Sequence, residues 1–114
     1  MIKIIAEALV YTATLVGCPT GDMCRVLYND ELQVIRFEDF AVPNITSECS
    51  TERAKAITAA MVTDAYMRQV GKVYSNMLKD SDGFLLVTAP ELKEHFIKFD
   101  YARELDDTKG WCND

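Results

Sequence analysis

Arg36, Glu38 and Asp39 place a cation and two carboxylates at the end of an apolar run that stops at Pro43. A guanidinium can hold a phosphate through two parallel hydrogen bonds, and carboxylates can bind a metal ion or accept a proton. Adjacent residues of a strand point to opposite faces, so Glu38 is the carboxylate that shares a face with Arg36. Two interpretations follow: a phosphate-handling site, or a local ion pair between Arg36 and Glu38, which is the simpler one.

The segments around this cluster predict strands in the first half of the chain. Leu9–Gly17 is rich in β-branched residues, and Cys24–Tyr28 and Leu32–Phe40 follow after turns, which gives an antiparallel meander. In the second half, Phe84–Val87 is typical of a short buried strand, and Gly71–Leu78 permits another. We therefore expect three strands, followed later in the chain by one or two more.

Two further segments have the spacing of helices. In Ser50–Gln69 the apolar residues recur at helical spacing, at Ala54, Ile57, Met61 and Ala65. Ser50 is the candidate N-cap of this helix. A second helix is expected after Thr88, which has the spacing of a capping box with Glu91 and is followed by Pro90 in the first turn.

The order of these elements, with strands and helices mixed along the chain, is typical of an α+β domain. An N-terminal meander in such an order favours a small five-stranded Greek-key β-barrel of the OB type, with two to three helices. The length of 114 residues fits one compact domain with one core. We therefore expect residues 1–114 to form a single domain.

The charge of the chain bears on its partners and its location. The 12 Lys and Arg residues stand against 18 Asp and Glu residues, and the formal net charge of −6 opposes a general attraction to nucleic acids. A protein partner is therefore favoured. The segment Leu15–Cys18 is similar to the acylation box of bacterial lipoproteins, but Glu7 and several polar residues interrupt the apolar run before it. We expect no membrane-spanning segment and a cytoplasmic location, with export disfavoured.

Four cysteines, at Cys18, Cys24, Cys49 and Cys112, lack the C-x-x-C spacing of a zinc site and share the chain with a single histidine. Buried free thiols are one interpretation of them. Alternatively, Cys18 and Cys24 flank a short turn and can face one another across a hairpin, and Cys49 can pair with Cys112 if the tail returns to the start of the first helix. The sequence leaves the redox state of the cysteines open.

The segment Ala13–Phe37 resembles the opening of the staphylococcal nuclease-like (thermonuclease) family, and the match continues without a gap to Pro43. That family has a D-G-D-T turn between two strands, here Thr20–Met23, and a later strand that ends in R-[LV]-x-x-[IV]-D-[TA]-P-E. Looser matches extend over nearly the whole chain, at Cys49, Glu52, Ala56, Gly83–Val87, Leu92–Ile97, Trp111 and Cys112. The resemblance implies an OB barrel with helices, and cleavage of DNA or RNA phosphodiesters with a bound calcium ion.

The resemblance assigns the chemistry of the family to six positions of this chain. Asp22 keeps one metal-ligating acid, and Arg36 keeps the first phosphate-binding arginine. The other four positions are substituted: Ala41 stands for the second ligating aspartate, Val42 for a residue that helps to order the site, Asn44 for the general base and Phe84 for the second arginine. An amide cannot accept a proton from water, and a phenyl ring offers a phosphate neither charge nor hydrogen bonds.

These substitutions predict the loss of catalysis and of the metal. Calcium prefers six to eight oxygen ligands, largely from carboxylates, and Asp22 alone cannot supply them. We therefore expect no cofactor and no catalytic residue, with Arg36, Glu38 and Asp22 as candidate binding residues. The alternative is a rebuilt calcium site that draws on Glu38, Asp22 and either Glu48 or Glu52.

The function predicted from the sequence is that of a non-catalytic, nuclease-like binding module that acts through a protein partner. By analogy, a small acidic pseudo-enzyme of this kind suits a viral or mobile-element inhibitor of a host factor, acting in the cytoplasm of the host cell. Two alternatives stay open. One is a metal-dependent DNA or RNA nuclease with the rebuilt calcium site, and the other is a non-catalytic binder of single-stranded nucleic acid.

Overall fold

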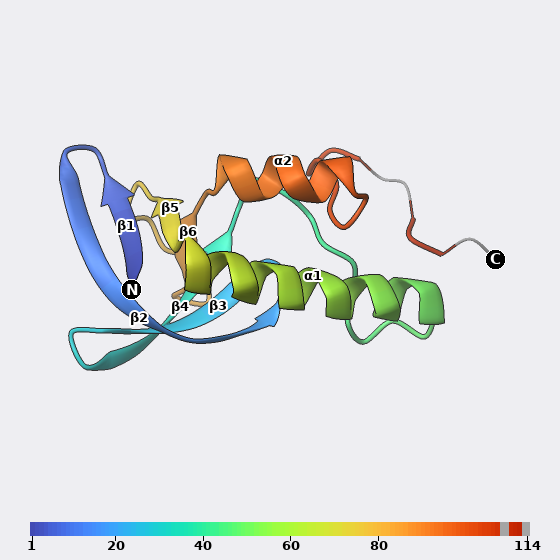
Figure 1. The fold of residues 1–114 in the computed structure, drawn as a ribbon, viewed down its shortest axis with the longest axis horizontal. Coiled ribbons are helices and arrows are strands. Elements are labelled where there is room, and N and C mark those ends of the chain that lie inside the picture. The colour runs from blue at the N-terminus through green and yellow to red at the C-terminus, as the bar shows by residue number, and fades with distance from the viewer. Residues whose placement is uncertain (108–109, 113–114) are drawn as a thin grey trace.

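The computed structural model describes residues 1–107 and 110–112. They form a small α+β fold in which two helices lie beside a curved six-stranded sheet (Figure 1). The strands are β1 (Ile2–Ala6), β2 (Leu9–Thr20), β3 (Met23–Tyr28), β4 (Glu31–Phe37), β5 (Lys72–Tyr74) and β6 (Leu85–Val87), and the helices are α1 (Ser50–Gln69) and α2 (Pro90–Lys98). Neither described helix has the length and apolar character needed to cross a bilayer.

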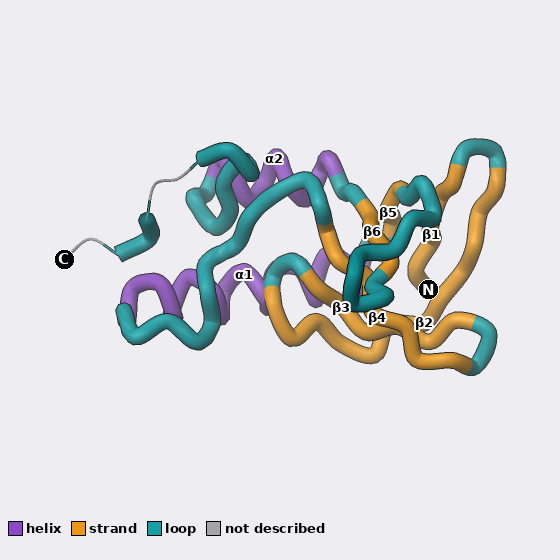
Figure 2. The backbone as a smooth tube through the Cα atoms, turned by 180° about the vertical axis from the view of Figure 1, so that it is seen from behind, coloured by secondary structure: helices purple, strands orange, loops and turns teal. Residues whose placement is uncertain are grey.

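The sheet nearly closes into a barrel at one end of the molecule, while the helices extend toward the other end (Figure 2). Its strand order is β5-β1-β2-β3-β4-β6, with antiparallel pairs from β1 to β4 and parallel pairs where β5 joins β1 and β6 joins β4. The two edges then meet, because Tyr74 and Thr88 exchange backbone hydrogen bonds of 2.9 and 2.8 Å. The Ser75 hydroxyl adds a bond of 2.8 Å to the Leu86 carbonyl.

The sequence predicts five strands, whereas the described residues form six. The difference lies in the opening run, which a turn at Glu7 and Ala8 divides into β1 and β2. Glu7 has a left-handed conformation with φ of 54°. Because glutamate and alanine are not common turn residues, the sequence pattern does not mark this turn.

Aromatic rings join the barrel to α2. Phe37 at the end of β4 stacks on Phe40 with ring centroids 5.6 Å apart, and Phe40 meets Phe96 of α2 edge to face at 5.3 Å. These rings are buried together with apolar residues from each strand: Ile2, Ile4, Ala13, Val26, Ile35, Val73, Leu85 and Val87. Burial of each large side chain stabilises the fold by about 1.5–3 kcal/mol.

Helix α1 covers the segment that the apolar spacing predicts, but its N-cap is Cys49, so the prediction of Ser50 as the N-cap is wrong. The helix approaches the turn between β2 and β3 closely. A Cβ added to Gly21 in that turn would come within 2.8 Å of the Ala59 Cβ. The buried Thr63 hydroxyl donates a hydrogen bond of 2.7 Å to the Gly21 carbonyl. Small residues at this contact therefore position α1 on the sheet.

Helix α2 begins at Pro90, but its predicted capping box is wrong. The N-cap is Ala89, and Thr88 instead pairs with Tyr74 across the barrel edge. The N-terminal end of α2 is capped by Asp39, a residue far from the helix in the sequence. Its Oδ2 accepts a hydrogen bond of 3.1 Å from the Ala89 backbone N–H. The other oxygen of Asp39 is buried without a partner among the described residues, and desolvation by burial raises the pKa of this carboxyl.

Both cysteine pairings that the sequence allows are present, and no cysteine is a free thiol. Cys18–Cys24 links β2 to β3, with Cα atoms 4.0 Å apart, and Cys49–Cys112 ties the start of α1 to the tail. Disulfides persist in oxidising compartments and are uncommon in the cytosol. The cytoplasmic location therefore stays a prediction from the sequence, and one that these pairings do not favour.

Candidate functional site

Contacts at the β2–β3 turn bring three of the six family positions into one neighbourhood. The Phe37 N–H, next to Arg36, donates a hydrogen bond of 2.8 Å to the Asp22 carbonyl. Val42 lies against Gly21, because a Cβ added to that glycine would be 3.1 Å from the Val42 Cγ1. Asp22, Arg36 and Val42 are therefore near one another at the β2–β3 turn.

The carboxylates proposed for a rebuilt metal site have separate surroundings. Asp22 accepts a hydrogen bond of 2.7 Å from the Thr20 hydroxyl, and Glu52 accepts one of 2.7 Å from the backbone N–H of Asn44. Glu38 lies beyond the end of β4, in a hollow that residues of β1 and β5 also line. Within the described ranges, no group of three or more His, Cys, Asp or Glu side chains is placed to hold a metal ion.

Arg36 pairs with Asp80, so the prediction of an ion pair with Glu38 is wrong. The Arg36 Nη1 lies 3.4 Å from the Asp80 Oδ2. Arg36 and Glu38 are both exposed on either side of the buried Phe37, but the turn after β5 brings the Asp80 carboxylate to Arg36 instead. Asp80 also accepts hydrogen bonds of 2.9 Å from the backbone N–H groups of Phe84 and of residue 82. These bonds, with the Phe84 bond as the largest cause and Arg36 as a smaller one, lower the pKa of Asp80.

The substituted family positions take part in the loops around the barrel. The Asn44 Oδ1 accepts hydrogen bonds from the backbone N–H and the hydroxyl of Thr46, at 2.9 and 2.8 Å, and so forms the turn before α1. Ala41 exchanges two backbone hydrogen bonds with Arg103 in the tail, at 2.8 and 2.9 Å. The Phe84 backbone is held by Asp80. Asn44 takes part through its side chain, whereas Ala41 and Phe84 take part through their backbones.

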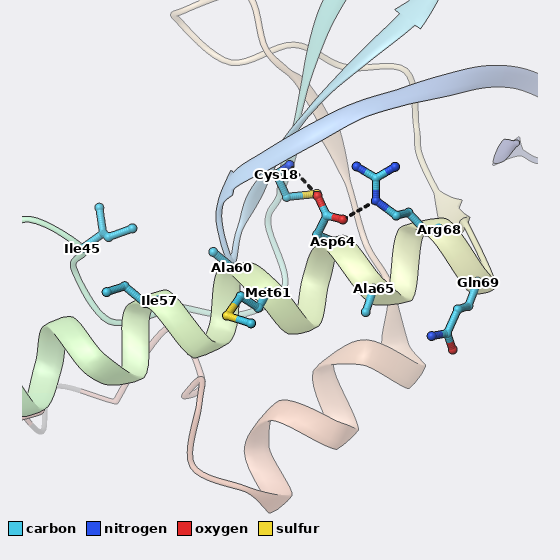
Figure 3. A pocket seen from close by; sticks show the side chains of 9 residues that line it. All are labelled: Cys18, Ile45, Ile57, Ala60, Met61, Asp64, Ala65, Arg68 and Gln69. Atoms are coloured by element: carbon cyan, nitrogen blue, oxygen red, sulfur yellow. Dashed lines mark hydrogen bonds and ion pairs between the residues drawn. The ribbon is translucent and has the colours of Figure 1, made fainter.

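A groove runs along the exposed side of α1, beside the end of β2 and the loop before the helix (Figure 3). We call it the α1 groove, and its volume is about 520 Å³. Its apolar part is formed by Ile45, Ile57, Ala60, Met61 and Ala65. Ile57 is 50% exposed and Met61 is 68% exposed, although both are large apolar side chains. An exposed apolar row of this kind is typical of a binding surface.

The apolar spacing that predicts α1 belongs to this exposed side. The residues Ala54, Ile57, Met61 and Ala65 are exposed, whereas the buried residues of the helix are Ala56, Ala59, Thr63 and Met67. Sequence reasoning found the helix but missed the groove. The sequence does contain a signal for the groove, because Ala56, Ala59 and Met67 form a second apolar row on the same helix. A single sheet covers only one side of a helix, so one of the two apolar rows must be exposed.

The other end of the α1 groove is polar. The Asp64 carboxylate accepts a hydrogen bond of 3.2 Å from the Cys18 backbone N–H and pairs with Arg68 one turn along the helix. An adjoining hollow contains Arg25, which has no ion-pair partner in the part of the chain that the structure describes. Two guanidinium groups against one carboxylate make this end positive, in a protein whose net charge is −6.

No model of a known protein family matches this chain, and no curated protein matches it. The resemblance to the thermonuclease family therefore stays a prediction from the residues that carry it. The polar side chains of Asp22, Arg36 and Asn44 have partners within the chain, whereas Ile57 and Met61 in the α1 groove are largely exposed.

Proposed function

We propose that this protein is a non-catalytic binding module that recognises a protein partner through the α1 groove. The observation that carries the proposal is the exposure of Ile57 and Met61 on one side of the helix. Water around these side chains is released when a partner covers them, which favours association. A few side chains that become fully buried near the centre of an interface commonly supply most of its binding free energy.

The partner that fits the groove is an amphipathic segment with an acidic residue beside its apolar side chains. The apolar side chains would pack on Ile57 and Met61, and the carboxylate would reach Arg25. Arg68 is already engaged by Asp64, so Arg25 is the stronger anchor for an acidic group. Complementary charge speeds the encounter of two proteins and fixes the register in which they dock.

Loss of catalysis is part of the proposal. It is supported by the separate surroundings of Asp22, Glu38 and Glu52, and by the pairing of Arg36 with Asp80. A guanidinium held by a carboxylate of its own chain is less available to a phosphate. The nuclease-like ancestry, the role as a viral inhibitor of a host factor and the location in a host cell stay predictions from the sequence.

Capture of a partner by matched variants tests the proposal. Immobilised wild-type protein is compared with Met61→Asp, in the groove, and with Leu32→Asp, which changes a 62% exposed leucine on β4 instead. We expect a partner that binds the wild type and Leu32→Asp equally but binds Met61→Asp at least about tenfold more weakly. Arg25→Glu should weaken the same complex. Equal capture by all four folded proteins would contradict the proposal.

A calcium titration followed by incubation with labelled single-stranded DNA tests the nuclease alternative. We expect no saturable calcium binding and no cleavage above the rate in buffer. Metal-dependent cleavage that is abolished both by a chelator and by Arg36→Ala would overturn the non-catalytic proposal. Retention of intact DNA that decreases steeply with salt would instead favour the nucleic-acid-binding alternative.

A further inference from the structure

A second pocket lies inside the barrel. Side chains of β1, β2, β3, β4 and β6 line it together with the segment that follows β5, and its volume is about 150 Å³. It shares no lining residue with the α1 groove. We propose that this barrel pocket binds a small molecule with a single aromatic ring and a carboxylate group. The proposal does not rest on the function proposed for the α1 groove.

The size and lining of the barrel pocket favour one ring. Ile4, Val26 and Leu85 form an aliphatic wall, and each is at most 5% exposed. Tyr11 and Tyr28 complete the wall with rings that meet edge to face, at a centroid distance of 6.1 Å. An apolar cavity of about 150 Å³ is large enough to take up benzene. Aromatic rings also prefer edge-to-face or offset contacts with a further ring, which these tyrosines can offer.

The charge of the barrel pocket comes from Lys79. It is the one charged residue among those that line the pocket, and no described residue forms an ion pair with it. An antiparallel β-bridge to Leu85 holds the Lys79 backbone beside the pocket. The Nε2 of Gln33, a polar neighbour in the lining, already donates to the carbonyls of Val34 and Gly83 at 3.3 Å. Recognition of a carboxylate therefore falls to the Lys79 ammonium group, which is exposed at the rim of the pocket.

Met77 gives the barrel pocket an adaptable side. Its side chain is 42% exposed, and its backbone has a left-handed φ of 59°. The Ser75 hydroxyl oxygen accepts a hydrogen bond of 2.9 Å from the Met77 N–H, which holds the backbone at this point. Methionine is flexible and makes favourable contacts with aromatic rings. A change of the Met77 rotamer can therefore adapt this side of the pocket to a ring.

Methyl NMR of the full chain with both disulfides intact, titrated with benzoate, tests the proposal. We expect saturable shifts at Ile4, Val26 and Leu85 and none at Ile57. Acetate supplies the carboxylate without a ring, and benzyl alcohol supplies a ring without the carboxylate. Each should bind at least about fivefold more weakly than benzoate, because each lacks one of the two contacts.

Variants separate the two contacts. Lys79→Met should weaken benzoate binding about fivefold and leave benzyl alcohol binding unchanged, whereas Tyr28→Leu should weaken both. Lys3→Met, which changes an exposed lysine of β1, is the matched control. The proposal is overturned if folded wild-type protein shows no saturable shifts at the three wall residues. It is also overturned if acetate or benzyl alcohol binds as tightly as benzoate, or if Lys79→Met has no effect.

Discussion

The family positions and the α1 groove differ in whether their side chains have partners within the chain. Asp22, Arg36 and Asn44 each have a side-chain partner within the chain, and these partners are Thr20, Asp80 and Thr46. Ile57 and Met61 remain largely exposed. This difference shows that a cluster of charged residues in a sequence is a weak guide to a binding site, because other polar groups of the same chain can pair with those charges. Large apolar side chains on a surface can be covered only by another molecule or by a rearrangement of the fold.

The largest effect of a single substitution is expected from Gly21→Ala, beside Asp22. The added Cβ would lie 2.8 Å from the Ala59 Cβ and 3.2 Å from the Ala59 carbonyl carbon, so α1 would have to shift. We expect the free energy of unfolding, measured with urea, to fall by roughly 1–3 kcal/mol. Gly17→Ala is the matched control, because its Cβ would meet only the Asp64 Oδ2 at 3.9 Å. Equal losses in the two variants would contradict the close contact between α1 and the turn.

A smaller effect, dependent on pH, is expected from Asp80→Asn. The hydrogen bonds from Phe84 and residue 82, with Arg36, lower the pKa of Asp80 in the folded protein. The carboxylate therefore stabilises the fold above the unfolded pKa of about 3.9, and this contribution is lost as the pH falls through the lowered pKa. The Tm of Asp80→Asn should be lower than that of the wild type at pH 7, and the two should converge in acid.

Thermal unfolding followed by circular dichroism between about pH 2 and pH 7 measures this difference. Asp82→Asn in the same turn is the control, because the Asp82 side chain forms no ion pair with a described residue. Arg36→Ala should reproduce part of the loss of Tm at pH 7, since Arg36 is one of the groups that lower the pKa of Asp80. Parallel curves for wild type and Asp80→Asn would show that Asp80 does not hold the loop.

The smallest effect on stability is expected from Met61→Ser in the α1 groove. The side chain is already 68% exposed, so its removal should change the free energy of unfolding by no more than about 0.5 kcal/mol. The same urea measurement that is used for Gly21→Ala checks this value. A loss as large as that of Gly21→Ala would mean that Met61 packs against the protein itself, and it would remove the main support for the proposed interface.

Local patterns in the sequence were enough to predict the helices and most of the strands. The helical spacing in Ser50–Gln69 matches α1, and the apolar run at Phe84–Val87 contains β6. The turn at Glu7 was missed because its left-handed residue is not of a type that marks turns. The cap of α2 was missed because it comes from Asp39, far from the helix in the sequence, while the local pattern pointed to Thr88.

The candidate site was harder to predict, because it depends on contacts between distant segments. Arg36 and Asp80 are 44 residues apart, so strand alternation, which compares only neighbours, selected Glu38 instead. Which face of α1 is buried depends on the close contact between Ala59 and Gly21. Periodicity gives the spacing of an apolar row but does not say whether the row faces a sheet or solvent.

The disulfide between Cys49 and Cys112 has a topological consequence. It closes α1, β5, β6 and α2 into one covalent macrocycle, to which the N-terminal strands are attached as a single branch. A protease that cuts once inside this ring, for example in the segment between β5 and β6, opens the ring but releases no fragment. The nicked molecule gains only the mass of one water until a reductant is added, because the disulfide keeps the fragment with β6 and α2 attached at the start of α1.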